Sequence, residues 1–269
     1  HRLPLRGRRL TSQVGGDFYD FIELPSGQLG LVIGDVTDKG VPAALVMATT
    51  RSMLRAAAGR LESPGAVLQR VNDVLCDEIP PNMFVTCLYA ILDPASGLLR
   101  FANAGHDLPY RHGPQGVDEL RARGMPLGLM PGMNYEEKEM ILAPGEGVLF
   151  YSDGLVEAHN PARDMFSFGR LQQLLGNARG SEGLVEMLLD ELAHFTGAGW
   201  EQEDDITMVL LERDMQAAQP ATATEWRTLA EWDLPPEFAT LRRLTHVNVL
   251  SSSLSFSLSL SFSLSLSLS

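Results

Sequence analysis

Apolar runs that end in glycine or an acidic residue alternate along the chain with stretches whose composition favours helices. The run GQLGLVIGDV predicts a buried strand over residues 28–33, and the Ala-, Leu- and Met-rich stretch that Pro42 opens predicts a helix. A second helix is predicted over residues 64–78. Two further apolar segments, MFVTCLYAILD and GLLRFANAGH, are separated by the turn sequence DPASG and therefore predict a hairpin.

The same alternation continues in the second half of the chain. GEGVLFYSDG predicts a strand that ends at Asp153, and SFGRLQQLLG and SEGLVEMLLDELAHFTG predict two helices with Gly176 and Gly197 at their C-caps. DDITMVLLER predicts a last strand, which begins with acidic residues. Strand hairpins interspersed with helix pairs indicate an α+β layered domain, not a run of βαβ units.

Composition limits the class of protein. Apolar residues make up 45% of the 269 residues, which is enough for a globular core. The 21 Lys and Arg against 34 Asp and Glu give a net charge of −13, which disfavours binding to nucleic acid or to an anionic membrane. No apolar run reaches the roughly 18 residues of a transmembrane helix, so we expect no membrane insertion. Two cysteines, Cys76 and Cys87, are too few for a disulfide scaffold and favour a reducing compartment, the cytoplasm.

The two ends of the chain differ from its middle. The sequence begins at His1 with a basic stretch that lacks the apolar region of a signal peptide, so we interpret it as the edge of a longer protein. Residues 251–269 contain eleven Ser, six Leu and two Phe in near-strict alternation, a pattern typical of a strand. An uncharged strand of that length would be a sticky exposed edge. We therefore favour the hypothesis that this tail is a translated CT dinucleotide repeat without function.

Acidic residues stand beside glycines at the ends of the predicted strands. The positions are Asp17, Asp35, Asp153 and the pair formed by Asp204 and Asp205. A single aspartate at a strand end can simply cap a turn, but the recurrence of this arrangement indicates a shared site. Converging carboxylates need a cation between them, and oxygen ligands without a nearby His or Cys favour Mg²⁺ or Mn²⁺.

Six short motifs occur in order along the chain. They are GGDFYD, GDVTDKG, NAGH, GMPLGL, YSDGLVEA and DDIT. Together they resemble the PPM family of protein phosphatase 2C-like enzymes, in its bacterial SpoIIE/RsbU branch. The resemblance covers about residues 10–213. It is specific because all six motifs occur together, although any one alone would be weak.

The resemblance implies a fold and a metal centre. The fold is a four-layer α-β-β-α sandwich of two antiparallel sheets flanked by helices, with two Mn²⁺ or Mg²⁺ ions in a cleft at one end. Carried over by motif, Asp35 would bridge both ions, and the backbone carbonyl of Val36 would assist one of them. The remaining ligands would be Asp17 for the second ion and, for the first, Asp153 with Asp204 or, as second choice, Asp205.

The same resemblance implies a phosphatase that acts on phosphoserine or phosphothreonine through water activated by the two ions, with Asp35 as the central catalytic residue. The implied substrate is an anti-sigma-factor antagonist in a bacterial partner-switching pathway. An upstream sensor domain or partner protein would control the phosphatase. The sequence leaves open whether the protein forms a homodimer. The alternative from another class is a non-catalytic module that keeps the fold and sequesters a signalling partner. The intact acids argue against that alternative.

Three other sequence features around the acids have competing interpretations. His106 invites a role as general acid toward the leaving oxygen, but we favour a hydrogen-bonded structural histidine. Asp20 and Asp38 are near enough in sequence to hold metal-bound water or a third ion, with a solvated loop acid as an equal alternative. No arginine occurs in residues 10–14, where other branches of the family place the one that holds the substrate phosphate, so the phosphate-binding residue is unassigned.

The helix pair predicted over residues 42–78 serves in the family as a regulatory switch beside the Asp35 loop. If it does so here, a polar residue at Met47 or Leu54 changes metal dependence as well as stability. Composition alone favours a simpler assignment, in which Met47 and Met53 with Leu45 and Leu54 belong to the core.

These patterns divide the chain into four segments. Residues 1–213 form the phosphatase domain, truncated at its N-terminal edge, and residues 214–223 form a linker. Residues 224–250 resemble the opening strand and first helix of a histidine-kinase-like ATPase domain, and an amphipathic tail docked on the phosphatase is an equal alternative. No ATP-binding Asn or glycine box follows, so nucleotide binding is not predicted. Residues 251–269 form the Ser/Leu tail.

Overall fold

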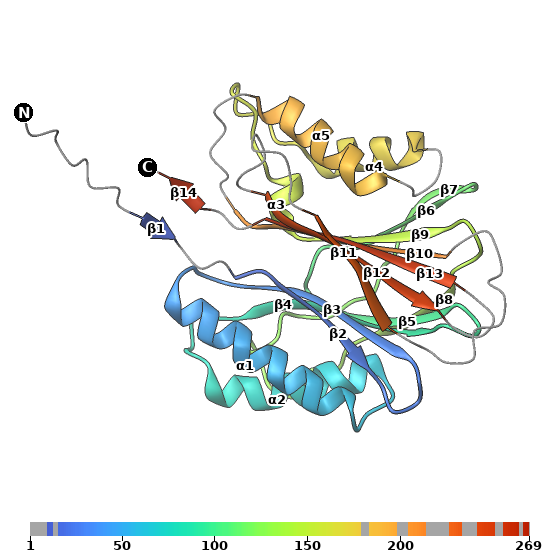
Figure 1. Ribbon diagram of the computed structural model, residues 1–269. Helices are drawn as coiled ribbons and strands as arrows, with labels where there is room; N and C mark the ends of the chain where they lie inside the picture. The colour runs from blue at the N-terminus through green and yellow to red at the C-terminus, as the bar shows by residue number, and fades with distance from the viewer. Residues whose placement is uncertain are drawn as a thin grey trace, which may run out of the picture.

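Two antiparallel sheets lie face to face, and helices cover the outer face of each (Figure 1). The computed structural model describes residues 10–12, 16–178, 183–197, 204–213, 226–232, 241–250, 255–263 and 266–268, with side chains only between residues 16 and 213. Helices α1 (Val41–Ala58) and α2 (Pro64–Glu78) lie on the first sheet, and α3 (Asp153–Val156), α4 (Phe168–Asn177) and α5 (Leu184–Thr196) lie on the second. The predicted four-layer α+β sandwich is confirmed.

The first sheet has the strand order β2-β3-β4-β5-β8. Its strands are β2 (Phe18–Glu23), β3 (Leu29–Val36), β4 (Val85–Asp93), β5 (Leu98–Ala104) and β8 (Glu137–Ile141). The predicted hairpin is present, since Asp93 pairs with Leu98 across the β4–β5 turn. The pattern missed β2 and β8 because each contains polar residues, and β8 has no buried residue at all.

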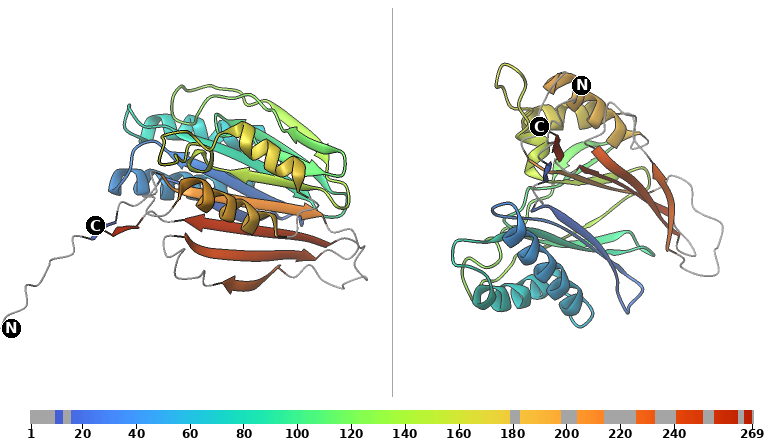
Figure 2. Two further views of the ribbon diagram at one scale, coloured as in Figure 1. Left: turned by 90° about the horizontal axis from the view of Figure 1, so that it is seen from above. Right: turned by 60° about the vertical axis from the view of Figure 1, so that its left-hand side comes forward.

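The second sheet has the order β11-β12-β13-β10-β9-β6-β7. Its strands in chain order are β6 (Tyr110–Gly113), β7 (Gly116–Glu119), β9 (Gly147–Tyr151), β10 (Ile206–Arg213), β11 (Trp226–Trp232), β12 (Leu241–Leu250) and β13 (Ser255–Ser263). Seen from above, β11 to β13 continue this sheet beyond β10 (Figure 2). The short β1 (Leu10–Ser12) pairs separately with β14 (Leu266–Leu268).

The prediction that β10 is the last strand was wrong, because four strands follow it. Residues 241–250 form a strand where the ATPase-domain resemblance implied a helix. In the Ser/Leu tail, residues 255–263 form a strand, as their alternation indicates, and this strand pairs with β10. The four-segment division of the chain and the dinucleotide-repeat origin of the tail stay predictions.

The predicted helices are present, with two corrections at single residues. Helix α2 begins at Pro64 behind an N-cap, Ser63, whose hydroxyl accepts a hydrogen bond from Ala66 N at 3.1 Å. Gly197 is the C-cap of α5 as predicted, with a φ of 77°. Gly176, however, lies inside α4, which continues to Asn177. Of the residues expected in the core, Leu54 is buried and Met47 and Met53 are partly buried, but Leu45 is 65% exposed on α1.

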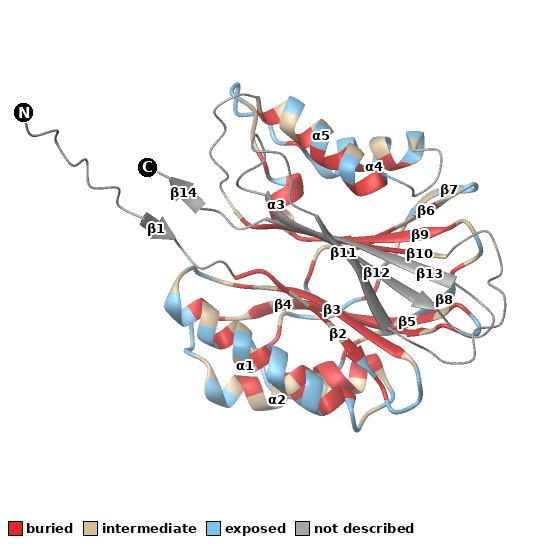
Figure 3. Ribbon diagram, viewed as in Figure 1, coloured by how far each residue is buried: buried red, intermediate tan, exposed pale blue. Residues whose placement is uncertain are grey.

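Buried hydrophobic residues form three clusters, between α1–α2 and the first sheet, between the two sheets, and between the second sheet and α3–α5. In Figure 3 the buried residues are red on the sheets and on the helices that cover them. Strand residues alternate between neighbouring layers, as the pleat requires. In β3, Leu31 and Ile33 face the second sheet whereas Val32 faces the helices. This parity decides which way the acids at the strand ends point.

None of the described helices is both long enough and apolar enough to cross a membrane.

Candidate metal centre

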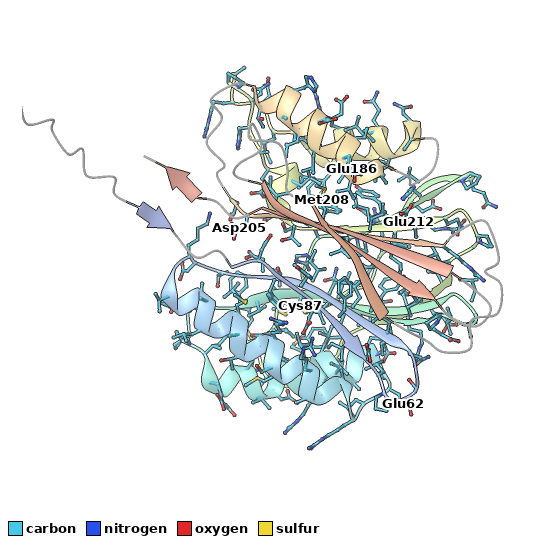
Figure 4. All side chains as sticks on the ribbon, viewed as in Figure 1. Glu62, Cys87, Glu186, Asp205, Met208 and Glu212 are labelled. Atoms are coloured by element: carbon cyan, nitrogen blue, oxygen red, sulfur yellow. The ribbon has the colours of Figure 1, made fainter. Side chains whose placement is uncertain are left out.

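The acidic residues singled out in the sequence meet at one end of the sandwich, near the start of α1. Asp35 has the parity of Leu31 and Ile33 in β3, so its side chain faces the second sheet. Asp205 has the parity of Val209 in β10 and faces the first sheet from the opposite side. Figure 4 labels Asp205 between the sheets at this end. The alternation that builds the core thus points these carboxylates toward one another from the two sheets. We call the end of the sandwich that carries Asp17, Asp35, Asp153, Asp204 and Asp205 the cleft.

Asp35 is the electrostatic centre of this group. Burial raises the pKa of its carboxyl to about 7, and the charges of Asp153, Asp204 and then Asp205 add to the rise. Asp35 in turn contributes to the raised pKa of Asp17. The Asp35 carboxylate therefore interacts electrostatically with the other four aspartates predicted as metal ligands.

Asp17 is 6% exposed and is held by hydroxyl groups of the second sheet. The Thr207 hydroxyl donates to Asp17 Oδ2 at 2.8 Å, and the Ser152 side chain also bonds to this carboxylate. Burial, followed by the charge of Asp35, nevertheless keeps the pKa of Asp17 well above its usual value. Hydroxyl groups thus fix Asp17 in position, and none of the ion pairs among the described residues involves it.

Asp153 and Asp204 form the more open part of the group. Asp153 is the first residue of α3, and burial with the charges of Asp204 and Glu157 raises its pKa to about 6. The Asp204 side chain is 47% exposed and forms an ion pair with Lys39, whose Nζ lies 2.8 Å from Oδ1. Asp205 is buried, and its backbone N–H donates to Asp204 Oδ1 at 2.9 Å. Of the two neighbouring acids, Asp204 is the one whose charge raises the pKa of Asp153.

The Val36 carbonyl and the Asp35 side chain both approach Gly16. A Cβ atom at residue 16 would collide with the Val36 carbonyl oxygen and with Asp35 Oδ1. The Gly16 carbonyl is also bonded to β3, since Val36 N donates to Gly16 O at 3.3 Å. The glycine beside Asp17 therefore leaves two oxygen donors, one from the backbone and one from a carboxylate, facing the same small space.

The donor set fits a hard divalent cation. It consists of carboxylate oxygens and one carbonyl, the ligands preferred by Mg²⁺ and Mn²⁺. As the side chains stand, no three His, Cys, Asp or Glu residues in the described ranges are grouped so that they could hold an ion. Like charges favour such separation, and the raised pKa values of Asp35 and Asp153 have part of their cause in this repulsion. A cation that drew the carboxylates together would offset it.

His106 has the structural surroundings that we favoured. It is 7% exposed, its Nδ1 lies 3.0 Å from the Thr86 hydroxyl, and its backbone N–H donates to Asn103 Oδ1 at 2.7 Å. The Asn103 side chain closes the loop by donating to His106 O at 2.8 Å. Burial lowers the pKa of His106 to about 4, so the ring is neutral at pH 7 and has no proton on offer as a cationic acid.

The two acids with competing interpretations have different surroundings: Asp20 is neither a cleft acid nor a solvated loop acid, whereas Asp38 matches the solvated loop acid. Asp20 is not a candidate for metal-bound water, because Arg51 and Arg55 both bind it from α1, with Arg55 Nε 2.5 Å from Oδ2. Asp38 lies exposed in the loop before α1 with a φ of 68°. Asp20 therefore joins β2 to α1 and does not serve the cleft.

Asp107 was not singled out in the sequence, although it lies beside the cleft. Burial raises the pKa of its carboxyl to about 7, and the charges of Asp153 and Glu157 contribute. Its position directly after His106 in the NAGH motif was the only available signal. The acidic cleft is therefore larger than the strand-end pattern indicated.

Comparison with known families identifies the fold. Residues 25–214 match the family model described as Stage II sporulation protein E (SpoIIE). The structure is similar to the SiaA-PP2C domain of Pseudomonas aeruginosa, with a TM-score of 0.64, 25% sequence identity, and coverage of 73% of this chain and 80% of that one. This similarity agrees with the two facing sheets and their flanking helices.

Two curated relatives are similar over most of this chain. Protein IcfG from Synechocystis sp. is 30% identical in an alignment of 232 positions that covers 75% of this chain and 36% of IcfG. Phosphoserine phosphatase RsbU from Bacillus subtilis is 27% identical in an alignment of 211 positions that covers 76% of this chain and 61% of RsbU. The chain thus spans about a third of one relative and three fifths of the other.

Proposed function

Because the chain belongs to the SpoIIE family and has the PP2C-like phosphatase fold, we propose that it hydrolyses phosphoserine or phosphothreonine in a protein substrate with the help of two Mn²⁺ or Mg²⁺ ions. The observation that carries the proposal is the position of Asp35. Its carboxylate interacts electrostatically with Asp17, Asp153, Asp204 and Asp205, which come from both sheets. A bridging ligand needs this central position.

The proposed ligands follow from these neighbours. Asp35 would bridge the two ions, with the Val36 carbonyl beside it. Asp153 and Asp204 would hold one ion because their charges act on each other, and Asp17 would hold the other. Asp205, which acts on Asp17 and Asp35, is the second choice to Asp204. When bound, such ions lower the pKa of a water molecule and offset charge on the phosphoryl oxygens.

The chain's own residues keep this arrangement in place. Thr207 and Ser152 orient the Asp17 carboxylate from the second sheet, so the two sheets are joined at the cleft itself. Thr86, opposite Asp35 in the sheet, lies 3.4 Å from the Asp35 carbonyl oxygen and 3.0 Å from His106 Nδ1. His106 therefore supports the strand that carries Asp35. We propose for it a positioning role and not the role of general acid.

The proposed substrate is a phosphorylated anti-sigma-factor antagonist in a bacterial partner-switching pathway. The relative RsbU is named a phosphoserine phosphatase, which supports the phosphoserine class. We further propose that an upstream sensor domain or partner controls the protein and that it acts in the cytoplasm, where free thiols such as Cys76 and Cys87 persist. A panel of phosphorylated antagonist proteins, each incubated with the chain and Mn²⁺, tests the substrate by release of phosphate.

Hydrolysis of p-nitrophenyl phosphate tests the reaction itself. We expect turnover that depends on Mn²⁺ or Mg²⁺ and that is lost in Asp35→Asn, with both proteins shown to be folded by circular dichroism. A folded wild type without metal-dependent turnover would favour the alternative, a binding module that keeps the fold but sequesters a phosphorylated partner. Pull-down of phosphorylated and unphosphorylated antagonist by that inactive protein would then distinguish the alternative from simple loss of function.

A further inference from the structure

The loop between β3 and α1 carries a lysine that reaches from the first sheet to the second. Lys39 Nζ lies 2.8 Å from Asp204 Oδ1, with the two side chains 34% and 47% exposed. The same positive charge opposes the rise that burial causes in the pKa of Asp153. Lys39 thus lies among the acids that the first metal ion would need.

The backbone of this loop is held by hydrogen bonds just before the lysine, at Thr37. Thr37 N and the Thr37 hydroxyl both donate to Phe84 O at 3.1 Å, and Phe84 N donates back to the Thr37 hydroxyl at 2.9 Å. Asp38 and Gly40, on either side of Lys39, both have positive φ, at 68° and 91°. A left-handed conformation is uncommon for a residue other than glycine. The loop therefore holds Lys39 in a defined place at the cleft.

Other cations near the sandwich are bound to different acids. Arg51 and Arg55 bind Asp20 on the outer side of the first sheet, and Arg111 binds Glu146 at the opposite end. Among the ion pairs of the part of the chain that the structure describes, the pair between Lys39 and Asp204 brings a cation to a cleft carboxylate. An ammonium and a divalent ion cannot both take the same Asp204 oxygen, and at short range they repel each other.

We propose that Lys39 is a resident counter-ion of the cleft, which stabilises the metal-free protein by pairing with Asp204 and competes with the divalent ion for that carboxylate. This proposal rests on the proposed metal centre but does not depend on the proposed phosphatase reaction. Two opposite effects follow from the same residue. Removing the charge weakens the metal-free fold, because the crowded carboxylates lose a positive neighbour. It also tightens metal binding, because the competitor is gone.

Direct metal binding tests the proposal. Chelator-treated wild type, Lys39→Met and Lys39→Arg are titrated with Mn²⁺ by isothermal titration calorimetry, and their Tm is measured in EDTA. We expect Lys39→Met to bind Mn²⁺ about fivefold more tightly than wild type and to have a lower Tm in EDTA. Lys39→Arg keeps the charge, so both quantities should stay near the wild-type values. Lys138→Met is the control, because Lys138 on β8 forms an ion pair of nearly the same length, with its Nζ 2.7 Å from Glu136 Oε1. This substitution should leave the Mn²⁺ affinity unchanged.

The outcomes separate this inference from the proposed function. A folded wild type that binds no Mn²⁺ contradicts the proposed metal centre. A wild type that binds Mn²⁺ while Lys39→Met binds it equally well or more weakly overturns the counter-ion role alone. If Lys39 had only a structural role, Lys39→Met would lower both the Tm and the Mn²⁺ affinity. If Lys39→Met does not fold, Lys39→Gln, which keeps a polar side chain of similar reach, is judged by the same two measurements.

Discussion

The two ends of the sandwich surround their buried acids differently. Away from the cleft, Glu146 is 4% exposed and is bound by Arg111, and its second oxygen accepts a hydrogen bond from Ala143 N at 2.8 Å. At the cleft, Asp35 and Asp153 are surrounded by other carboxylates, and burial with their charges raises the pKa of each. The fold supplies a cation and an N–H group where an acid is structural. At the cleft Lys39 pairs with the more exposed Asp204, while Asp35 and Asp153 lie beside other carboxylates, as a site for a divalent ion requires.

The strand β10 connects the two ends, with cleft acids at its start and a structural arginine at its end. It begins next to Asp204 and Asp205 in the cleft and ends at Arg213, whose Nη1 donates to Leu142 O at 2.5 Å and to Ser96 O at 3.2 Å. Arg213 thereby ties the β4–β5 turn to the segment before β9. Substitutions at the two ends should therefore separate activity from stability.

The largest expected effect is at the cleft. Asp35→Asn should lower metal-dependent turnover by about 100-fold or more, because the bridging carboxylate is lost. In EDTA the same variant should have a higher Tm than wild type, because one of the repelling charges is removed. Phosphate release and thermal unfolding measure the two quantities. A lower Tm of Asp35→Asn in EDTA would contradict the view that this end of the molecule is strained by like charge.

The opposite end should respond in the opposite way. Glu146→Gln should lower the free energy of unfolding by about 2 kcal/mol, because Arg111 loses its carboxylate while the Ala143 hydrogen bond can persist. Its turnover per folded molecule should stay near that of wild type. Urea unfolding measures the change, with Glu136→Gln, from the exposed pair with Lys138, as the control that should show little change. Loss of turnover in a folded Glu146→Gln would end the separation of the two ends.

A pair of glycines allows a matched test with a smaller effect. At Gly97, with a φ of 80°, a Cβ would press against Arg213 Nη1 and Leu142 O, so Gly97→Ala should cost about 1–2 kcal/mol of stability and leave Mn²⁺ binding intact. At Gly16 a Cβ would meet the Val36 carbonyl and Asp35 Oδ1, so Gly16→Ala should weaken Mn²⁺ binding. Calorimetric titration of both variants decides. Equal loss of Mn²⁺ affinity in the two would mean that the effect at Gly16 is not local.

The smallest effect is in the pH dependence of the metal-free protein. The raised pKa values belong to Asp17, to Asp35 and Asp107 at about 7, and to Asp153 at about 6. Between about pH 4 and 7 the folded protein holds protons on these groups that the unfolded chain has released, so their contribution to stability is lost as pH rises. His106 and His112, with pKa values lowered by burial to about 4, act in the opposite direction below about pH 6.5.

Since the acids outnumber these two histidines, we expect a higher Tm in EDTA at pH 5 than at pH 7. Saturating Mn²⁺ should reverse this order, because bound cations favour the ionised carboxylates. Thermal unfolding at both pH values, with and without Mn²⁺, gives the four numbers required. A metal-free protein that becomes steadily more stable from pH 5 to pH 7 would contradict the assignment of the raised pKa values to the cleft.

Local patterns in the sequence predicted the elements whose stability is largely local. Helix α2 begins at the proline and ends at the glutamate that the pattern indicated, because a Ser N-cap and a run of spaced apolar residues define it. The β4–β5 hairpin follows from its turn residues. By contrast, β8 is a mostly exposed strand that exists through its pairing with β5, which no local pattern indicates. Leu45 is helical but points away from the sheet, which composition could not decide.

The candidate site was predictable as a set of acids but not as a set of contacts. Strand parity points Asp35 and Asp205 toward each other, and the charge of Asp205 contributes to the raised pKa of Asp35. The choice of Asp204 before Asp205 as a metal ligand stays a prediction. The partners of Asp20 and Asp204 could not be foreseen, since Arg55 and Lys39 reach them from distant parts of the sequence. Such ion pairs depend on side-chain reach across packed layers, which spacing along the chain does not encode.

The bonds around Arg213 also fix the register of β10. Gly145 N donates to Arg213 O at 2.7 Å, and Arg213 N donates to Glu146 O at 3.0 Å. Sliding β10 by two residues would preserve which side chains face the core, so hydrophobic burial alone discriminates weakly against it. Such a slip would, however, carry Asp204 and Asp205 about 7 Å along the strand axis. The polar contacts around Arg213 therefore determine where Asp204 and Asp205 lie at the other end of the molecule. A register error in β10 would misplace these acids and abolish the site even when the core is well packed.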